Sequence, residues 1–253
     1  MPRHISVALD GVDLSSVAPV LIQQVHEDAP ALELTEADRP GRYGQRLAAR
    51  KRQSLRVAVE FALRERFDLA ARAHWASEIL RWSRGEWLEL SYRPDQRLRV
   101  RCTAEPALTE ARNYAAVLRV EFTAYAVPYW EDKIAVAKIL TGTSAETGFP
   151  VPGVVETPLE LVVTPTGGTL TNFSVTAGGQ TVALTGLSIP QNTALTFSRD
   201  FQDSLAISAA GVSQLPRRTA ASADDLLLTP GRQTVSFTAD TACTVTILAR
   251  GRG

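Results

Sequence analysis

The stretch from Leu55 to Leu63 alternates between apolar side chains and side chains that are polar or small. The apolar set is Leu55, Val57, Val59, Phe61 and Leu63. A period of two places this set on one face of a β-strand, because successive residues of a strand point to opposite faces. The other face carries Arg56 and Glu60. The sequence therefore predicts a strand that covers a core on one side only.

A helix pattern follows this strand. Asp68 is placed to cap its first turn, because a carboxylate there accepts hydrogen bonds from the exposed backbone amides. Ile79 and Leu80 lie at the apolar centre of one helical face, and Trp82 flanks that face. Gly85 is expected to end the helix in the left-handed conformation, which glycine adopts without steric cost.

A hairpin pattern comes next, with apolar positions on both sides of an Arg-Pro-Asp-Gln turn. On its returning strand, Arg97, Arg99 and Arg101 alternate with apolar residues, so we expect them on one face of one strand. Like charges repel there unless acidic groups lie beside them, from a neighbouring strand, another subunit or a polyanion. Glu86 and Glu89 are the nearby candidates, which favours cross-strand ion pairs over a DNA-binding groove.

Residues 26–53 carry many charges, interrupted by proline and glycine, and they read as irregular. An irregular stretch of this length in a compact domain is usually functional or mobile. The basic run from Arg39 to Arg52 has the charge to bind phosphate, and a solvated arm is the alternative.

The composition changes after Trp130, and the sequence predicts three parts. They are an N-terminal α+β domain, mainly β with one helix, over residues 1–135, a linker over 136–157, and a C-terminal antiparallel β-sandwich over 158–253. The linker is rich in Gly and Pro and holds one strand or a short helix within IAVAKIL. Beyond it, short apolar runs alternate with turn signals such as Gly178-Gly179 and Asp240, a spacing typical of sandwiches. The closing run DLLLTPGRQTVSF resembles the last strands of jelly-roll or galectin-like modules.

Charge and hydropathy exclude some classes of protein. The formal net charge is zero, and neither half has the strong basic excess of a nucleic-acid-binding protein. No apolar run approaches the ~20 residues that span a bilayer, and MPRHISVALDG lacks the parts of a secretion signal. We therefore expect a soluble protein made in the cytoplasm, with Cys102 and Cys243 as buried free thiols.

No residue pattern typical of catalysis is present. His4, His26 and His74 lack the spacing of metal ligands. No nucleophile elbow, P-loop or dinucleotide-binding motif occurs. Asp224 and Asp225 have the charge to bind a cation, but a turn before a strand is their more ordinary role. The sequence predicts no catalytic residue, no metal, no cofactor and no enzyme activity.

The order of elements resembles the N-terminal domain of the distal tail proteins of long-tailed phages. The resemblance rests on the strand RVAVEFAL, on Arg72 and Trp82 in the helix, on the run GEWLELSYRPDQRL, and on PYWE after a strand. Distal tail proteins commonly carry a second domain of the sandwich type, so the resemblance extends over the whole chain.

This resemblance implies a structural role in the tail tip of a virion, or in a related injection device. It implies a homo-hexameric ring, built from the N-terminal domains, that joins the tail tube to the baseplate and adhesion apparatus. The implied partners are the tail tube protein and a tail-tip protein, with no membrane, and DNA passes through the ring without specific binding. In the family, the segment at 26–53 is an arm or hairpin that reaches a neighbouring subunit. The expected subunit interface comprises Arg39, Arg42, Tyr43, Arg46, Leu47, Arg97, Arg99 and Arg101.

Two other functions stay open. A carbohydrate-binding module would use an exposed aromatic ring, yet the region after Leu159 has no Trp and no Tyr. Phe173, Phe197 and Phe237 occupy strand positions that suit a core. A tail-associated hydrolase is the third alternative, and the lack of any catalytic motif argues against it.

Overall fold

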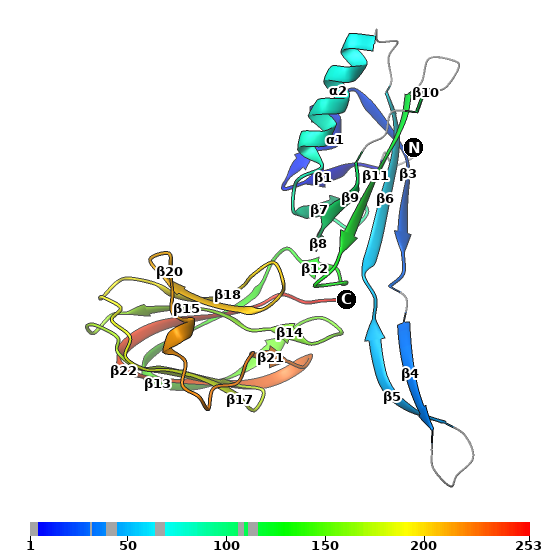
Figure 1. The fold of residues 1–253 in the computed structure, drawn as a ribbon. Coiled ribbons are helices and arrows are strands. Elements are labelled where there is room, and N and C mark those ends of the chain that lie inside the picture. The colour runs from blue at the N-terminus through cyan, green and yellow to red at the C-terminus, as the bar shows by residue number, and fades with distance from the viewer. Residues whose placement is uncertain (1–4, 31, 39–44, 64–68, 106–108, 111–115) are drawn as a thin grey trace. The chain divides into compact units, whose positions relative to one another are not determined.

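The computed structural model describes residues 5–30, 32–38, 45–63, 69–105, 109–110 and 116–253, and it describes their side chains except at 32, 36–38, 45–52, 69, 72, 109, 110 and 116. The chain divides into two units, Met1–Trp130 and Glu131–Gly253. Each unit contains a hydrophobic core of its own. Both are built mainly from antiparallel strands, which confirms the expected fold class (Figure 1).

The alternating stretch forms β6 of the first unit, inside a sheet of the order β10-β11-β6-β3, with β9 also paired to β11. The strands are β3 (Val20–Asp28), β6 (Leu55–Leu63), β9 (Arg101–Ala104), β10 (Thr109–Glu110) and β11 (Ala116–Ala124). Val57, Val59 and Phe61 are fully buried, as the alternation predicts, and Arg56 is exposed. One face of this sheet therefore carries the core of the first unit.

A second sheet of the first unit has the order β8-β7-β1-β2, with two helices beside it (Figure 1). The elements are β1 (Val7–Leu9), β2 (Val12–Asp13), α1 (Leu14–Val17), α2 (Leu69–Trp82), β7 (Trp87–Leu90) and β8 (Gln96–Arg99). The predicted helix is α2, and Ile79 and Trp82 on it are buried. The Trp82 ring packs edge-on against Phe122, with ring centroids 6.0 Å apart. The helix thus closes the core over the first sheet. The expected capping residue, Asp68, lies outside the described residues.

Glycine is needed at position 85, after α2, but for a different reason from the one expected. Its φ is not positive, so the prediction of a left-handed cap was wrong. A Cβ at this position would lie 2.9 Å from both the Cβ of Leu9 and Oδ2 of Asp10. Real Cβ contacts are not that short. Glycine is needed because β1 passes close to the turn after the helix.

The returning strand of the hairpin is in two pieces. β8 ends at Arg99 and pairs with β7, whereas β9 begins at Arg101 and pairs with β11. Between them, the amide of Val100 donates to the carbonyl of Glu86 at 2.8 Å. Arg101 therefore belongs to a different sheet from Arg97, and the expectation that all three arginines share one strand was wrong. The chain crosses here from one sheet to the other.

The charged segment 26–53 was expected to be irregular, and it is largely strand. β3 continues to Asp28, and β4 (Leu32–Asp38) and β5 (Gln45–Arg52) form an antiparallel pair of their own. Leu32 lies opposite Arg52, and the register shifts between Thr35 and Glu36. Both strands carry many charged residues, so they show no clear alternation of apolar and polar side chains. The sequence pattern therefore did not predict β4 and β5. In Figure 1, this β4–β5 hairpin leads away from the sheet that contains β3 and β6.

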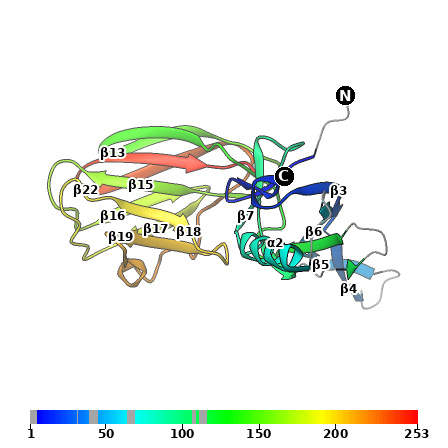
Figure 2. The same cartoon turned by 90° about the horizontal axis from the view of Figure 1, so that it is seen from above.

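The second unit is one curled antiparallel sheet of the order β17-β16-β22-β15-β18-β19-β20, with β13 paired along β22 (Figure 2). Its strands are β13 (Val136–Val151), β15 (Glu160–Pro165), β16 (Phe173–Ala177), β17 (Gln180–Leu184), β18 (Leu195–Arg199), β19 (Leu205–Ala209), β20 (Val212–Ser213) and β22 (Gly231–Ala249). Shorter elements are β12 (Glu131–Asp132), the pair β14 (Thr157–Pro158) and β21 (Leu227–Leu228), and the 3-10 turn η1 (Leu215–Arg217).

Two long strands carry this sheet around the core. Residues 235–239 of β22 pair with β16, and residues 243–248 pair with β15, so β22 passes from one half of the sandwich to the other. β13 follows it, with a register shift between Gly142 and Ser144. Phe173, Phe197 and Phe237 lie in the enclosed core, which confirms the sandwich and the core positions predicted for these rings.

Two expectations for this region were wrong. Residues 136–157 do not form a linker, because β13 occupies 136–151 and pairs with β22 along its length. Asp240 was expected to lie in a turn between two strands, but it lies inside β22. Glycine and proline suggested breaks within residues 136–157, and Asp240 suggested one near the end of the chain, whereas β13 and β22 continue through these residues and bend between the halves of the sandwich.

Candidate assembly surface

The carboxylate of Glu27, near the end of β3, accepts hydrogen bonds from three side chains in two other parts of the first unit. Tyr92 donates its hydroxyl, Trp130 donates Nε1 at 3.2 Å, and Arg93 donates Nη2 at 3.1 Å. The Arg93 guanidinium also lies over the Trp130 ring, 4.8 Å from its centroid. A charged acceptor shared by three donors fixes their positions. Glu27 therefore ties β3 to the turn of the β7–β8 hairpin and to the end of the first unit.

Tyr92 remains a donor in this cluster at any ordinary pH. Burial raises the pKa of the Tyr92 hydroxyl well above its usual range, and the hydrogen bond to Glu27 raises it further. Both effects disfavour the phenolate next to a carboxylate.

The guanidinium groups of Arg97 and Arg99 both lie over the Trp87 ring. The Arg97 guanidinium lies 3.7 Å from the ring centroid and that of Arg99 lies 5.5 Å from it. Arg99 also forms an ion pair with Glu86, which confirms the cross-strand partner expected from the sequence. Arg101 is exposed on β9. The expected repulsion between these arginines is thus relieved at Arg99 by a neighbouring strand of the same chain.

The remaining expected interface residues belong to the β4–β5 hairpin and its connection. Arg39, Arg42 and Tyr43 lie outside the described residues. Arg46 and Leu47 lie in β5, opposite Ala37 and Glu36 in the backbone register. The structure therefore places these two on the separate hairpin and does not bring them together with Arg97, Arg99 and Arg101.

The hairpin has an uneven distribution of charge and an exposed apolar position. β4 contains Glu33, Glu36 and Asp38, whereas β5 contains Arg46, Arg50, Lys51 and Arg52. Leu34 on β4 is 50% exposed, and its neighbours Glu33 and Thr35 are exposed too. A hairpin with two strands and no further partner strand is marginally stable in water. Contact with another protein surface would stabilise it.

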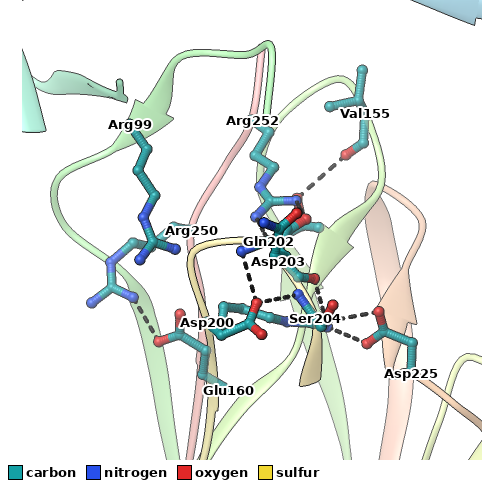
Figure 3. A network of polar contacts seen from close by, with 12 residues as sticks. Arg99, Val155, Glu160, Asp200, Gln202, Asp203, Ser204, Asp225, Arg250 and Arg252 are labelled. Carbon is teal, nitrogen blue, oxygen red and sulfur yellow. Dashed lines mark hydrogen bonds and ion pairs between the residues drawn. The ribbon is translucent and has the colours of Figure 1, made fainter. Parts of the chain in front are cut away.

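Arginine–carboxylate pairs organise one end of the second unit (Figure 3). Arg252 holds Asp203 through two hydrogen bonds of 2.9 and 2.7 Å. Arg199, with only 5% of its side chain exposed, is paired with Asp225. Arg250 is paired with Glu160 at 2.6 Å. Because each cation is matched inside the unit, these groups fix loops and do not form a charged site.

Asp224 and Asp225, considered from the sequence as a cation site, are separated by their partners. Asp225 pairs with Arg199, and Asp224 pairs with Arg218 at 3.0 Å. Among the described residues, no group of three His, Cys, Asp or Glu side chains is arranged to hold a metal ion. In the part of the chain that the structure describes, no helix is both long and apolar enough to cross a bilayer.

The two cysteines are free thiols. Burial raises the pKa of both the Cys102 and Cys243 thiols. A thiol with a raised pKa is a poor nucleophile, because the thiolate is the reactive form. Cys243 is buried, as predicted, whereas Cys102 is only partly buried.

Sequence reasoning missed the Glu27 cluster. Trp130 stood out within PYWE, but its partner lies in a segment that was expected to be irregular. No local signal marked this end of the strand, because the residues after Val25, namely His26, Glu27 and Asp28, are all polar and show no alternation.

Comparison with known proteins supports the fold. No family model and no curated protein sequence matches the chain. The chain is similar to the crystal structure of SPP1 Dit, described as a paradigm of the hub adsorption apparatus in phages that infect Gram-positive bacteria. The TM-score is 0.68 at 14% identity, over 98% of this chain and 99% of that chain.

Two structures of the phage p2 baseplate in its activated conformation contain similar chains. In the strontium form, the TM-score is 0.54 at 9% identity, over 97% of each chain. In the calcium form, the TM-score is 0.51 at 10% identity, over 98% of each chain. These likenesses concern the fold, and they cover both units. The resemblance indicated by the sequence is confirmed at this level: the chain has the fold of a phage distal tail protein.

Proposed function

We propose that this protein is a structural subunit of a phage tail tip, where six copies form a ring that joins the tail tube to the baseplate and adhesion apparatus. The observation that carries the proposal is the full-length likeness to SPP1 Dit, which includes both units. Its role is geometric and non-enzymatic. The partners are the tail tube protein and a tail-tip protein, and DNA passes through the ring without specific binding.

The β4–β5 hairpin is the part of the first unit best suited to join neighbouring subunits. It pairs with no other described strand, and it offers basic β5 and acidic β4 on one element. An interface between different patches of identical subunits closes into a ring when its rotation allows. Arg46 and Leu47 on β5, together with Arg39, Arg42 and Tyr43, then meet a neighbour. Charge pairs in such an interface weaken with salt, because screening acts over ~8 Å at physiological ionic strength.

The carbohydrate-binding alternative receives no support from the second unit. Sugar recognition by stacking requires an accessible aromatic ring. Phe149, Phe173, Phe197 and Phe237 are buried, with exposed fractions of 0–3%. These rings serve the core, so the second unit offers at most Phe201 for stacking.

The first prediction tests the ring by removing the hairpin. Asp28 lies opposite Arg56 in the β3–β6 pair, so a short Gly-Ser turn can replace residues 30–53 and reconnect the two strands without strain. Light scattering after size exclusion should show wild-type hexamers, or monomers that assemble as concentration rises. The variant should stay monomeric and still unfold in a cooperative thermal transition, because the deletion removes only β4 and β5 and leaves the core residues of the first unit in place. A wild-type protein that is monomeric or dimeric at every concentration and salt, without rings in negative-stain images, contradicts the proposal.

A further inference from the structure

One edge of β13 is paired with no strand in the part of the chain that the structure describes. β13 runs over 16 residues, Val136–Val151, and its strand partner is β22, which lies between β13 and the rest of the sheet (Figure 2). A typical strand has ~5–6 residues. A long unpaired edge presents a row of backbone N–H and C=O groups to which another strand can bind. Such an edge needs protection if the second units are not to associate through it.

The first half of β13, residues 136–142, has the composition of a strand that pairs readily. Ile139 is 63% exposed, and it lies opposite Thr246, which in turn lies opposite Val162. Branched side chains of this kind favour extended structure. Lys138 is the only charged residue between positions 136 and 142. Its charge is therefore the one that opposes the approach of another strand to this half.

The Lys138 ammonium lies against the backbone of β13 itself. Lys138 shares a face of the strand with Val136 and Leu140, which pack against the core. Its Nζ donates to the carbonyl of Gly148 at 3.2 Å, ten positions further along the same strand, because β13 bends where its register shifts. A strand that paired with this edge would take the ammonium out of water or break its contact, and both cost free energy. Charges that point inward protect edge strands in this way.

The second half of β13 is protected by other features. Pro150 has no N–H to donate to a further strand, and Glu146 places an exposed negative charge on this half. Residues 136–142 contain neither proline nor an acidic side chain. The protection of the first half therefore depends on Lys138.

We propose that Lys138 prevents the free edge of β13 from pairing with β13 of a second copy of this chain. Two identical edges are complementary across a two-fold axis, because antiparallel strands then exchange donors and acceptors. Such a pair would join two second units into one continuous sheet. The inference concerns an association that the wild type avoids, so it does not depend on the proposed ring.

Lys138→Thr tests this role, because threonine suits a strand and carries no charge. In the full-length protein, light scattering after size exclusion should show particles of about twice the wild-type mass or more as the concentration rises, since each two-fold contact joins two copies. Hydrogen exchange measured by mass spectrometry should slow in residues 136–142 as these particles form, because free backbone N–H groups enter a ladder. The wild type at the same concentrations should show neither change.

Two matched variants separate the edge from the loss of charge alone. Lys138→Arg keeps a cation on the edge, and Lys133→Thr removes a lysine that lies outside β13, so both should keep the wild-type mass. Thermal unfolding shows whether each variant is folded, and Lys138→Gln replaces Lys138→Thr if the latter unfolds. The proposal is overturned if the folded, uncharged variant keeps the wild-type mass at every concentration. It is also overturned if Lys138→Arg or Lys133→Thr associates as strongly, or if exchange slows elsewhere than in β13.

Discussion

Glu27 joins three side chains of the first unit through hydrogen bonds to its carboxylate. Glu27→Gln keeps the shape of the side chain but removes its charge. It also places an amide NH2 among the donors of Tyr92, Arg93 and Trp130. Because the buried Trp130 and the partly exposed Tyr92 and Arg93 lose a shared charged acceptor, we expect the free energy of unfolding to fall by about 1–3 kcal/mol. Urea unfolding followed by tryptophan fluorescence measures the change.

Glu121→Gln is the matched control for this prediction. Glu121 also pairs with an arginine, Arg119, but both side chains are well exposed. Exposed pairs of this kind contribute roughly 0–1 kcal/mol. Equal losses in the two variants would show that the Glu27 cluster has no special structural role.

Single residues show where sequence reasoning succeeds and where it stops. The Arg99–Glu86 pair was predictable, because both residues belong to one hairpin whose register follows from its turn. The partner of Trp130 was not predictable, because Glu27 lies 103 positions away and the contact depends on how two sheets pack. Gly85 was noticed for its position, but its cause is a close approach of Leu9, which no local pattern reveals.

At the scale of elements, the bend in β22 depends on Asp240. Its carboxylate accepts hydrogen bonds from the Thr171 and Asn172 amides at 3.1–3.2 Å, and it also binds the Thr171 hydroxyl. These contacts hold the loop before β16 against the place where β22 passes from one half of the sandwich to the other. Asp240→Asn keeps the shape but loses the charge, so we expect a loss of about 1 kcal/mol at pH 7.

The pH dependence of this loss follows from the pKa of Asp240. Burial alone would raise it, but the hydrogen bonds from Thr171 and Asn172 lower the pKa below the ordinary value of 3.8. The stabilisation is therefore present above that value and disappears as the pH falls through the lowered pKa. Urea midpoints of the wild type and Asp240→Asn should differ at pH 7 and converge near pH 2. Asp224→Asn, at a fully exposed carboxylate, should show a smaller difference, and a constant gap for Asp240→Asn would refute the argument.

The elements of the first unit were more predictable than those of the second. β6, α2 and β7 each carry a clear local period, and each was found where the period placed it. β13 and β22 contain glycine, proline or aspartate at points where the sequence suggests an end. Pairing along a common partner overrides those local signals, because a bent ladder still satisfies the backbone. Such pairing is not visible in one strand taken alone.

At the scale of the whole molecule, the fold is set by the order and pattern of elements more than by residue identity. A likeness over 98% of the chain at 14% identity is possible because cores tolerate substitution when apolar pattern and volume are kept. Because the apolar pattern sets the fold, the fold class could be predicted from the sequence alone. The role that we propose for the β4–β5 hairpin rests on the family resemblance, since its exposed charges impose no packing pattern.

The second unit should fold when produced alone, because its core is drawn entirely from residues 149–249. The residue at which the segment begins determines whether it folds. A segment that begins at Glu131 keeps the hydrogen bond from the Asp132 amide to the Gly251 carbonyl and should unfold cooperatively. A start at Val136 loses that contact and should melt several degrees lower. A start at Pro158 removes β13 with Phe149, which is fully buried, and a lost core Phe alone costs about 3–5 kcal/mol, so this segment should not fold. Circular dichroism melts of the three compare them directly, and a folded segment from Pro158 would restore residues 136–157 to the role of a linker.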